Sequence, residues 1–226
     1  MSSRPELHVL EDPAVVVGEL LATRARTGGQ MALTGGSTPR IAYERAAALQ
    51  PDWGAVSVWW GDERCVPPDD ERSNYLLTDE SLLSRLEAPP RQVHRIRGEL
   101  KAEDAAAELD SALAGVILDL VLLGMGPDGH VASLFPGSPQ LAVEDRRAVS
   151  GPPGLEPFVE LVTMTLPVLR AARRIVLLVT GDAKADAIAR AFGPEIDEEL
   201  PASLLRLAAV PVEVFLDRAA GSKIGR

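Results

Sequence analysis

The chain has few cysteines and histidines, and each shortage excludes a class of protein. Its 226 residues contain one cysteine, Cys65, so an internal disulfide is impossible and the reducing cytoplasm is the expected location. The three histidines, His8, His94 and His130, are far apart in the sequence and show no paired spacing typical of metal ligands. The sequence therefore predicts neither a disulfide-stabilised secreted protein nor a metal site.

The chain also lacks long hydrophobic runs and a surplus of basic residues. Its first 13 residues contain no apolar segment typical of a signal peptide, and no window approaches the length of a membrane span. The net charge of -10 repels polyanions, so neither nucleic acid nor a membrane is expected as a partner. A small anionic ligand is still compatible with this charge where a few basic residues converge.

No serine- or glycine-rich linker, long charge run or internal repeat divides the sequence, so residues 1–226 are expected to form a single domain. A hydrophobic fraction of 46% and a charged fraction of 25% are typical of a globular protein with a sizeable core. Apolar runs typical of buried strands alternate with helical patterns. This alternation predicts an α/β fold with a doubly wound, mostly parallel sheet flanked by helices.

Turn residues, prolines and apolar spacing place the elements along the sequence. Asp12 is expected to cap the first helix, with Pro13 at its first position. Residues 140–158 contain three prolines and are expected to be irregular, and residues 167–172 are expected to form a helical turn. The expected strands are 7–10, 30–33, 56–60, 93–96, 117–123, 161–166, 175–179 and 210–216. The expected helices are 13–25, 40–49, 73–86, 101–113 and one that ends at Phe192.

The stretch from Ile117 to Pro136 is the most informative part of the sequence. Its first seven residues are almost all apolar, which is typical of a strand buried on both faces of a parallel sheet. Three glycines within six residues then predict a sharp loop, which carries Asp128 and His130. Open α/β sheets place their active sites at the carboxyl ends of such strands. Asp128 and His130 are therefore candidate catalytic residues.

A second glycine-containing loop, TGGSTP at residues 34–39, lies between an expected strand and an expected helix. This arrangement is typical of phosphate binding, because backbone N–H groups and the positive end of the helix dipole face the anion. A tight turn capped by serine or threonine explains the same residues about equally well. The loop lacks the Gly-Lys-Ser/Thr ending of a P-loop. The candidate phosphate-binding residues are Gly35, Gly36, Ser37 and Thr38.

Charged residues follow two further strands. Asp62, Glu63 and Arg64 come after the strand at 56–60, where an exposed loop with a local ion pair is the simpler interpretation. Lys184 falls in the first turn of the helix that follows the strand at 175–179, where a cation is unfavourable to the helix dipole unless it meets an anion. Together, the four strand ends describe a pocket with a phosphate cradle, two cations and a histidine.

Two other enzyme classes fit the sequence poorly. The glycines at 124, 126 and 129 match G-x-G-x-x-G, but Pro136 ends the following helical stretch too early for a dinucleotide-binding helix. Glu144 has the spacing of the ribose-binding acid but lies in no apolar strand. The sequence contains no G-x-S-x-G elbow, which argues against a serine hydrolase of the α/β type.

Several motifs, taken together, resemble the 6-phosphogluconolactonase family across nearly the whole chain. They are LTGGSTP, WWGDER, SNY, LLGMGPDGHVASLFPGSP, TLPVL and VTGDAKADA. The resemblance implies a Rossmann-like fold and hydrolysis of 6-phospho-D-glucono-1,5-lactone in the oxidative pentose phosphate pathway. It also implies a small phosphorylated sugar lactone as the partner and no cofactor. The related glucosamine-6-phosphate deaminases share the phosphate loop and the lysine motif, but this chain reads GHVASLFPGSP where a deaminase reads GHIAFNEP.

Under this reading, His130 is the general base that activates water, because an imidazole with a pKa near about 6.5 suits proton transfer at neutral pH. Arg64 is expected to stabilise the oxyanion or contact the sugar hydroxyls, and Asp128 to orient the imidazole or belong only to the turn. Asp62 is a further candidate for the chemistry. The phosphate is assigned to the 34–39 loop together with Lys184.

Arg170 marks a departure from the family pattern. The family's arginine before the T-L-T segment is missing near Leu161, and Arg170 stands where the family has an asparagine. Arg170 is therefore the candidate that replaces the missing cation. Two alternative functions stay open, a deaminase-like sugar-phosphate isomerase and a sugar-phosphate binding module without catalysis. The expected assembly is a monomer or a weak homo-oligomer.

Overall fold

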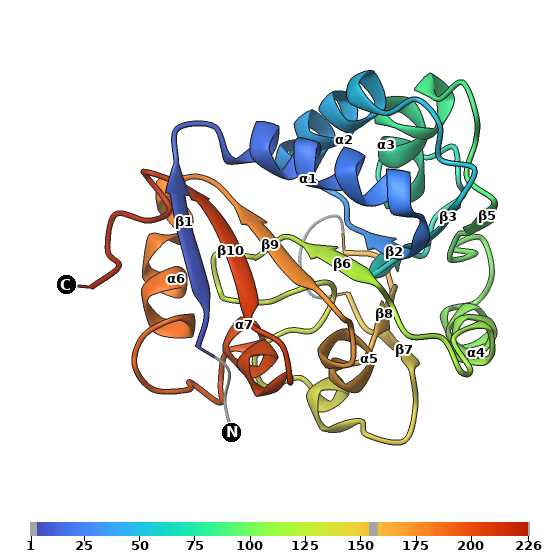
Figure 1. Cartoon of the computed structure of the whole chain (residues 1–226). Coiled ribbons are helices and arrows are strands. Elements are labelled where there is room, and N and C mark those ends of the chain that lie inside the picture. Colours follow the sequence, from blue (N-terminus) through green and yellow to red (C-terminus); the bar gives the residue numbers. More distant parts are fainter. Residues whose placement is uncertain (1–3, 154–157, 226) are drawn as a thin grey trace.

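A computed structural model describes residues 4–153 and 158–225 of the chain, and its centre is a seven-stranded sheet (Figure 1). All neighbouring strands in this sheet pair in parallel. This arrangement confirms the predicted doubly wound, mostly parallel α/β fold. In spatial order the strands are β1 (Glu6–Leu10), β10 (Val212–Asp217), β9 (Ile175–Val179), β6 (Leu120–Leu123), β2 (Gly29–Leu33), β3 (Val56–Trp60) and β5 (Gln92–His94).

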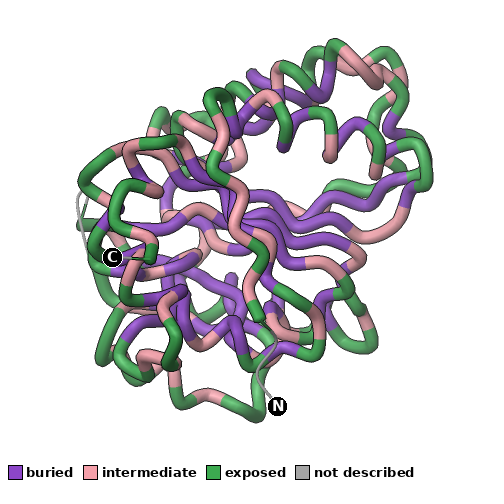
Figure 2. The backbone as a smooth tube through the Cα atoms, turned by 60° about the vertical axis from the view of Figure 1, so that its left-hand side comes forward, coloured by how far each residue is buried: buried purple, intermediate pink, exposed green. Residues whose placement is uncertain are grey.

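Helices cover both faces of the sheet. On one face lie α1 (Pro13–Thr27), α2 (Ser37–Leu49) and α3 (Asn74–Ser81) (Figure 1). On the other lie α5 (Leu166–Arg170), α6 (Ala185–Ala191) and α7 (Pro201–Leu204). Between the two layers, the strands β3, β6 and β9 consist entirely of buried residues (Figure 2). Burial on both faces explains why these strands read as unbroken apolar runs.

A second, smaller sheet was not expected. It contains β4 (Asp62–Arg64), β8 (Leu161–Met164) and β7 (Ala148–Gly151), which pair in antiparallel order, and α4 (Ala102–Ala112) packs beside it. The interpretation of residues 62–64 as an exposed loop was wrong, because they pair with β8. Residues 140–158 are not irregular throughout, since β7 lies among them. Residues 154–157 of that stretch lie outside the described residues.

Several boundaries differ from the prediction. Helix α2 begins at Ser37 rather than at residue 40, and Asp12 makes no side-chain capping bond to α1. The predicted strand at 117–123 is shorter in the structure, where β6 begins at Leu120. Ile117, which is 51% exposed, precedes the strand. The predicted helix at 73–86 ends at 81, and a separate 3₁₀ turn follows at 83–85. Helix α7 was not predicted. No helix within the described residues is long and apolar enough to cross a lipid bilayer.

Candidate active site

The main sheet reverses its winding between β2 and β6, and the candidate site lies at this point. From β2 the chain continues outwards through β3 and β5, whereas from β6 it continues in the other direction through β9 and β10. The loops after two neighbouring strands therefore separate and leave a crevice at their carboxyl ends. A cavity of about 500 Å³ opens there. The predicted site residues that line it are Gly35, Gly36, Ser37, Thr38, Asp62, Arg64, His130 and Lys184.

His130 is oriented by the carboxylate two residues before it. The Nδ1 atom of His130 lies 2.6 Å from Asp128 Oδ1, and the same oxygen accepts the His130 backbone N–H at 3.2 Å. Because a carboxylate accepts hydrogen bonds, Nδ1 carries the proton, and the lone pair of the neutral ring is on Nε2. Phe135 packs against the imidazole with ring centroids 4.7 Å apart. The arrangement presents a base with a defined tautomer.

The glycines around His130 are required by the fit of the imidazole. A Cβ at Gly126 would collide with His130 Nδ1, and Gly129 adopts a φ of +85°, which favours glycine. A Cβ at Gly129 would also lie 2.7 Å from Leu200 Cδ2. Two of the three glycines in the G-x-G-x-x-G spacing, Gly126 and Gly129, are therefore explained by the packing of the loop that carries His130.

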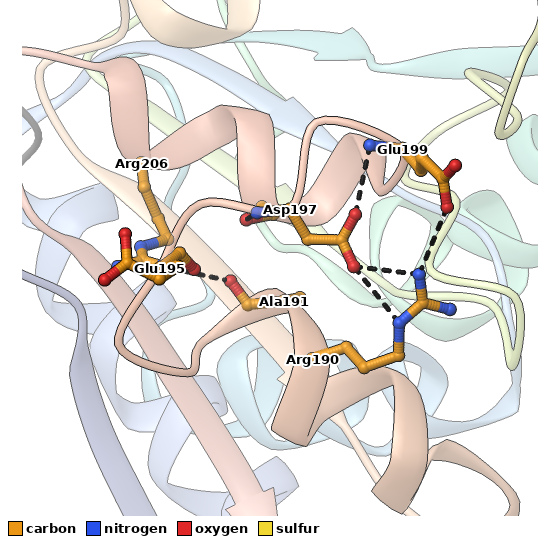
Figure 3. A network of polar contacts seen from close by, with 7 residues as sticks. Arg190, Ala191, Glu195, Asp197, Glu199 and Arg206 are labelled. Carbon is orange, nitrogen blue, oxygen red and sulfur yellow. Dashed lines mark hydrogen bonds and ion pairs between the residues drawn. The ribbon is translucent and has the colours of Figure 1, made fainter.

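The segment between α6 and α7 packs against the loop that carries His130. Two arginines hold the segment in place (Figure 3). Arg190 forms a salt bridge with Asp197 at 2.8 Å, and Arg206 donates to the carbonyl oxygen of Glu195 at 2.8 Å. The segment leads to Leu200, which is 3% exposed and packs on Gly129, and the backbone N–H of residue 202 donates to the Gly129 carbonyl oxygen at 3.1 Å.

The first turn of α2 faces the pocket with free backbone donors. Gly36 precedes the helix with a φ of +109°, and no side chain caps the helix N-terminus. Such an end attracts anions because its first N–H groups lack partners within the helix. Thr38 Oγ1 lies 2.7 Å from Thr180 Oγ1, which ties the loop to the end of β9. The buried Tyr43 hydroxyl holds the loop from below by accepting from the Thr34 N–H at 2.9 Å.

Lys184 also lines the pocket and lies in a 3₁₀ turn, Asp182–Lys184, that precedes α6. Partial burial lowers the pKa of Lys184, and the negative charge of Asp128 opposes this effect. Among the described residues, no salt bridge involves Lys184. The ammonium group is therefore available to an anionic ligand.

Glu63, in the Asp-Glu-Arg motif, has a structural role that the sequence did not reveal. It is 2% exposed and accepts hydrogen bonds from the backbone N–H groups of Arg64, Asn74 and Tyr75, each at 2.8 Å. The hydroxyl of Ser73 donates to it at 3.0 Å. Burial raises the pKa of Glu63, and these hydrogen bonds oppose the rise. Glu63 therefore anchors the N-terminus of α3, and within residues 4–153 and 158–225 no ion pair of the kind expected includes it.

The flanking residues of this motif, Asp62 and Arg64, both line the pocket. Asp62 Oδ2 accepts from the Ser133 hydroxyl at 2.6 Å. Burial raises the pKa of Asp62, whereas the Ser133 hydrogen bond and the positive charge of Arg64 lower it. Arg64 Nη1 donates to the Asn74 amide oxygen at 3.0 Å. Thus one strand delivers a carboxyl and a guanidinium group to the same cavity.

Arg170 does not join the pocket. It is absent from the cavity lining, pairs with Glu144 at 3.3 Å and donates to the Leu166 carbonyl oxygen at 3.3 Å. The expectation that it replaces a phosphate-binding cation is therefore not supported. Three polar residues that line the cavity were missed, namely Asn74, Ser133 and Thr180. All three had a signal in the sequence, because Asn74 lies in the SNY motif, Ser133 in LLGMGPDGHVASLFPGSP and Thr180 in VTGDAKADA.

Known enzymes are similar to this chain in sequence and in fold. The chain is 38% identical over 208 residues to 6-phosphogluconolactonase of Homo sapiens, covering 87% of this chain and 81% of that protein. It is 34% identical over 199 residues to 6-phosphogluconolactonase of Haemophilus influenzae, covering 84% and 85%. The solved 6-phosphogluconolactonase of Trypanosoma cruzi superposes with a TM-score of 0.86 at 28% identity and covers 100% of this chain and 99% of its own.

The family description that matches the chain spans most of its length. Its match runs from residue 14 to residue 213 and therefore includes every strand end that contributes to the pocket. The resemblance seen in the sequence motifs is confirmed by this match. The chain belongs to the family of glucosamine-6-phosphate isomerases and 6-phosphogluconolactonases.

Proposed function

We propose that the chain hydrolyses 6-phospho-D-glucono-1,5-lactone to 6-phospho-D-gluconate, the lactonase step of the oxidative pentose phosphate pathway. The observation that carries the proposal is the Asp128-oriented His130 in a cavity that also holds an uncapped helix N-terminus and Lys184. The oriented His130 suits the activation of water, whereas the helix N-terminus and Lys184 suit the binding of a phosphate. Relatives that are more than a third identical to this chain over the aligned residues carry the name of this enzyme.

In the proposed reaction His130 Nε2 removes a proton from water as the water oxygen attacks the lactone carbonyl carbon. The carbonyl electron pair moves onto its oxygen, and Arg64 stabilises the resulting oxyanion. When this intermediate collapses, the bond between the carbonyl carbon and the ring oxygen breaks. The protonated His130 then donates its proton to the ring oxygen, which becomes a hydroxyl. The new carboxyl group ionises to water, and the base is regenerated without a cofactor.

The test is a coupled assay of freshly made 6-phosphogluconolactone, in which 6-phosphogluconate is detected as it forms. We expect added protein to accelerate product formation in proportion to its concentration. An unchanged spontaneous rate, combined with measurable binding of 6-phosphogluconate, would instead identify a binding module without catalysis. Because the family also includes isomerases of glucosamine 6-phosphate, that compound is the second substrate to assay.

We also propose that the chain acts in the cytoplasm as a monomer or weak homo-oligomer, and that its residues form a single domain. The single cysteine supports the location, and the continuous hydrophobic core supports a single folding unit. Analytical ultracentrifugation at micromolar concentration tests the assembly. One cooperative thermal transition would support the single domain.

A further inference from the structure

The first residue of α3, Asn74, lies between the arginine and the phosphate loop of the pocket. It is 4% exposed, and it lines the cavity. Its amide oxygen accepts from Arg64 Nη1 at 3.0 Å, and its amide nitrogen donates to the carbonyl oxygen of Asp62 at 3.0 Å. Gly35 packs directly on the amide, since a Cβ there would collide with Asn74 Oδ1. Both polar ends of this buried side chain are therefore committed to the site.

Among the described residues, the hydrogen bonds of the Arg64 guanidinium go to neutral groups alone. Besides Asn74, its Nη1 atom donates to the backbone carbonyl oxygen of Arg72 at 2.6 Å. In the described part of the chain, no salt bridge includes Arg64. The neighbouring Glu63 accepts from the Arg64 backbone N–H and not from its side chain. The guanidinium is thus fixed in position while its charge stays available.

We propose that Asn74 is a positioning residue that fixes Arg64 through a neutral acceptor and so reserves its charge for the substrate. The inference rests on the lactonase activity proposed above. A carboxylate at position 74 would hold the arginine equally well but would compensate its charge. A small apolar residue would leave the charge free but would let the side chain move. The amide of Asn74 holds Arg64 in position and leaves its charge uncompensated. Its contact with Gly35 also fixes the position of the phosphate loop relative to Arg64.

Three variants separate these roles. We expect Asn74→Ala to lower kcat for the phosphorylated lactone by about 10–100-fold, the size of one charge-assisted hydrogen bond, with little change in KM. We expect Asn74→Asp, which keeps the shape and the acceptor, to lower kcat at least as far. In an Arg64→Ala background, Asn74→Ala should cause almost no further loss, because two residues that act as one unit are not additive.

Ser73→Ala is the matched control for damage to α3. It removes the hydroxyl that caps this helix by accepting from the Leu76 N–H at 3.1 Å, but Ser73 does not line the cavity. We expect it to lower the melting temperature and to keep kcat. A wild-type rate in Asn74→Asp, or full additivity with Arg64→Ala, overturns the inference while the lactonase proposal stands. A wild-type chain that does not accelerate lactone hydrolysis overturns both.

Discussion

The hydrogen bond between Asp128 and His130 decides which ring nitrogen is free to act as the base that we propose. With Nδ1 bound to the carboxylate at 2.6 Å, Nε2 is the atom that can accept a proton. We predict that His130→Ala folds normally and loses about 10²–10⁴-fold in kcat, the usual contribution of a positioned base. Circular dichroism and a steady-state assay measure the two effects. A variant that retains more than about half of the wild-type rate rules out His130 as the base.

In our proposal, the positive charge of Lys184 binds the phosphate group of the substrate. We predict that Lys184→Ala lowers kcat/KM for the phosphorylated lactone by about 10–100-fold and scarcely affects unphosphorylated glucono-δ-lactone. Arg170→Ala is the control, because it removes a cation outside the cavity, and both substrates should be turned over normally. Equal losses on both substrates would place Lys184 in the chemistry or in folding.

The same lysine predicts a pH dependence of binding. Burial lowers the pKa of Lys184, so the ammonium loses its proton at a lower pH than a free lysine. The affinity for 6-phosphogluconate should therefore fall as pH rises into the alkaline range below the ordinary lysine pKa. Titration calorimetry across that range, with Lys184→Arg for comparison, measures the effect. An arginine stays charged, so a decline of equal size in that variant contradicts the assignment.

At the scale of elements, the N-terminus of α3 depends on a buried carboxylate. Four donors converge on Glu63, three of them backbone N–H groups. In Glu63→Gln an amide NH₂ would face two of these donors, so we predict a loss of about 1–3 kcal/mol in the free energy of unfolding. Glu80→Gln is the matched control, since Glu80 is paired with Arg40 at the surface, and it should cost less than about 1 kcal/mol. Urea titration measures both, and equal losses contradict the prediction.

The segment between α6 and α7 supports the catalytic loop through Leu200. We predict that Leu200→Ala lowers both stability and kcat, because removing its side chain leaves a cavity behind Gly129 and loosens His130. Leu205→Ala is the control, because Leu205 is also buried, whereas the atoms that a Cβ at Gly129 would approach most closely all belong to Leu200. It should lose similar stability, about 2–5 kcal/mol, while kcat holds. If kcat falls equally in both variants, the loss reflects general destabilisation.

Much of the secondary structure follows from the local sequence. The exceptions share one cause, which is their dependence on tertiary contacts. Strands β3 and β9 match their predictions to the residue, because apolar runs with both faces buried need no further information. Strand β4 was missed because its three charged residues have no apolar pattern and become a strand only by pairing with β8. The strand ends predicted which loops meet, and most of the predicted site residues line one cavity. Arg170 lies outside the cavity and Asn74 was not predicted to line it, because the side-chain direction in a short or first helical turn depends on tertiary packing.

At the scale of the whole molecule, the histidine and carboxylate side chains that lie close enough together to bind a metal ion are remote from the pocket. Among the described residues, one such cluster is found, Glu6, His8 and Glu213, on β1 and β10. Glu6 and Glu213 lie at the starts of parallel strands, whereas the cavity opens at strand ends. We predict that EDTA and nicotinamide nucleotides leave the lactonase rate unchanged. Inactivation by EDTA that zinc reverses would contradict this.

The pairing of the first strand with the last has a consequence for biosynthesis. Strand β1 lies at the edge of the sheet, where its one neighbour is β10, from Glu6 beside Glu213 to Leu10 beside Asp217. Strand β1 is translated before β10, because β10 lies far downstream in the sequence. Contacts so distant in sequence form slowly, because the intervening chain must lose its freedom before the pairing is gained. A premature stop before Val212 would therefore remove β10, which would leave β1 without its neighbour in the sheet and β9 paired with β6 alone.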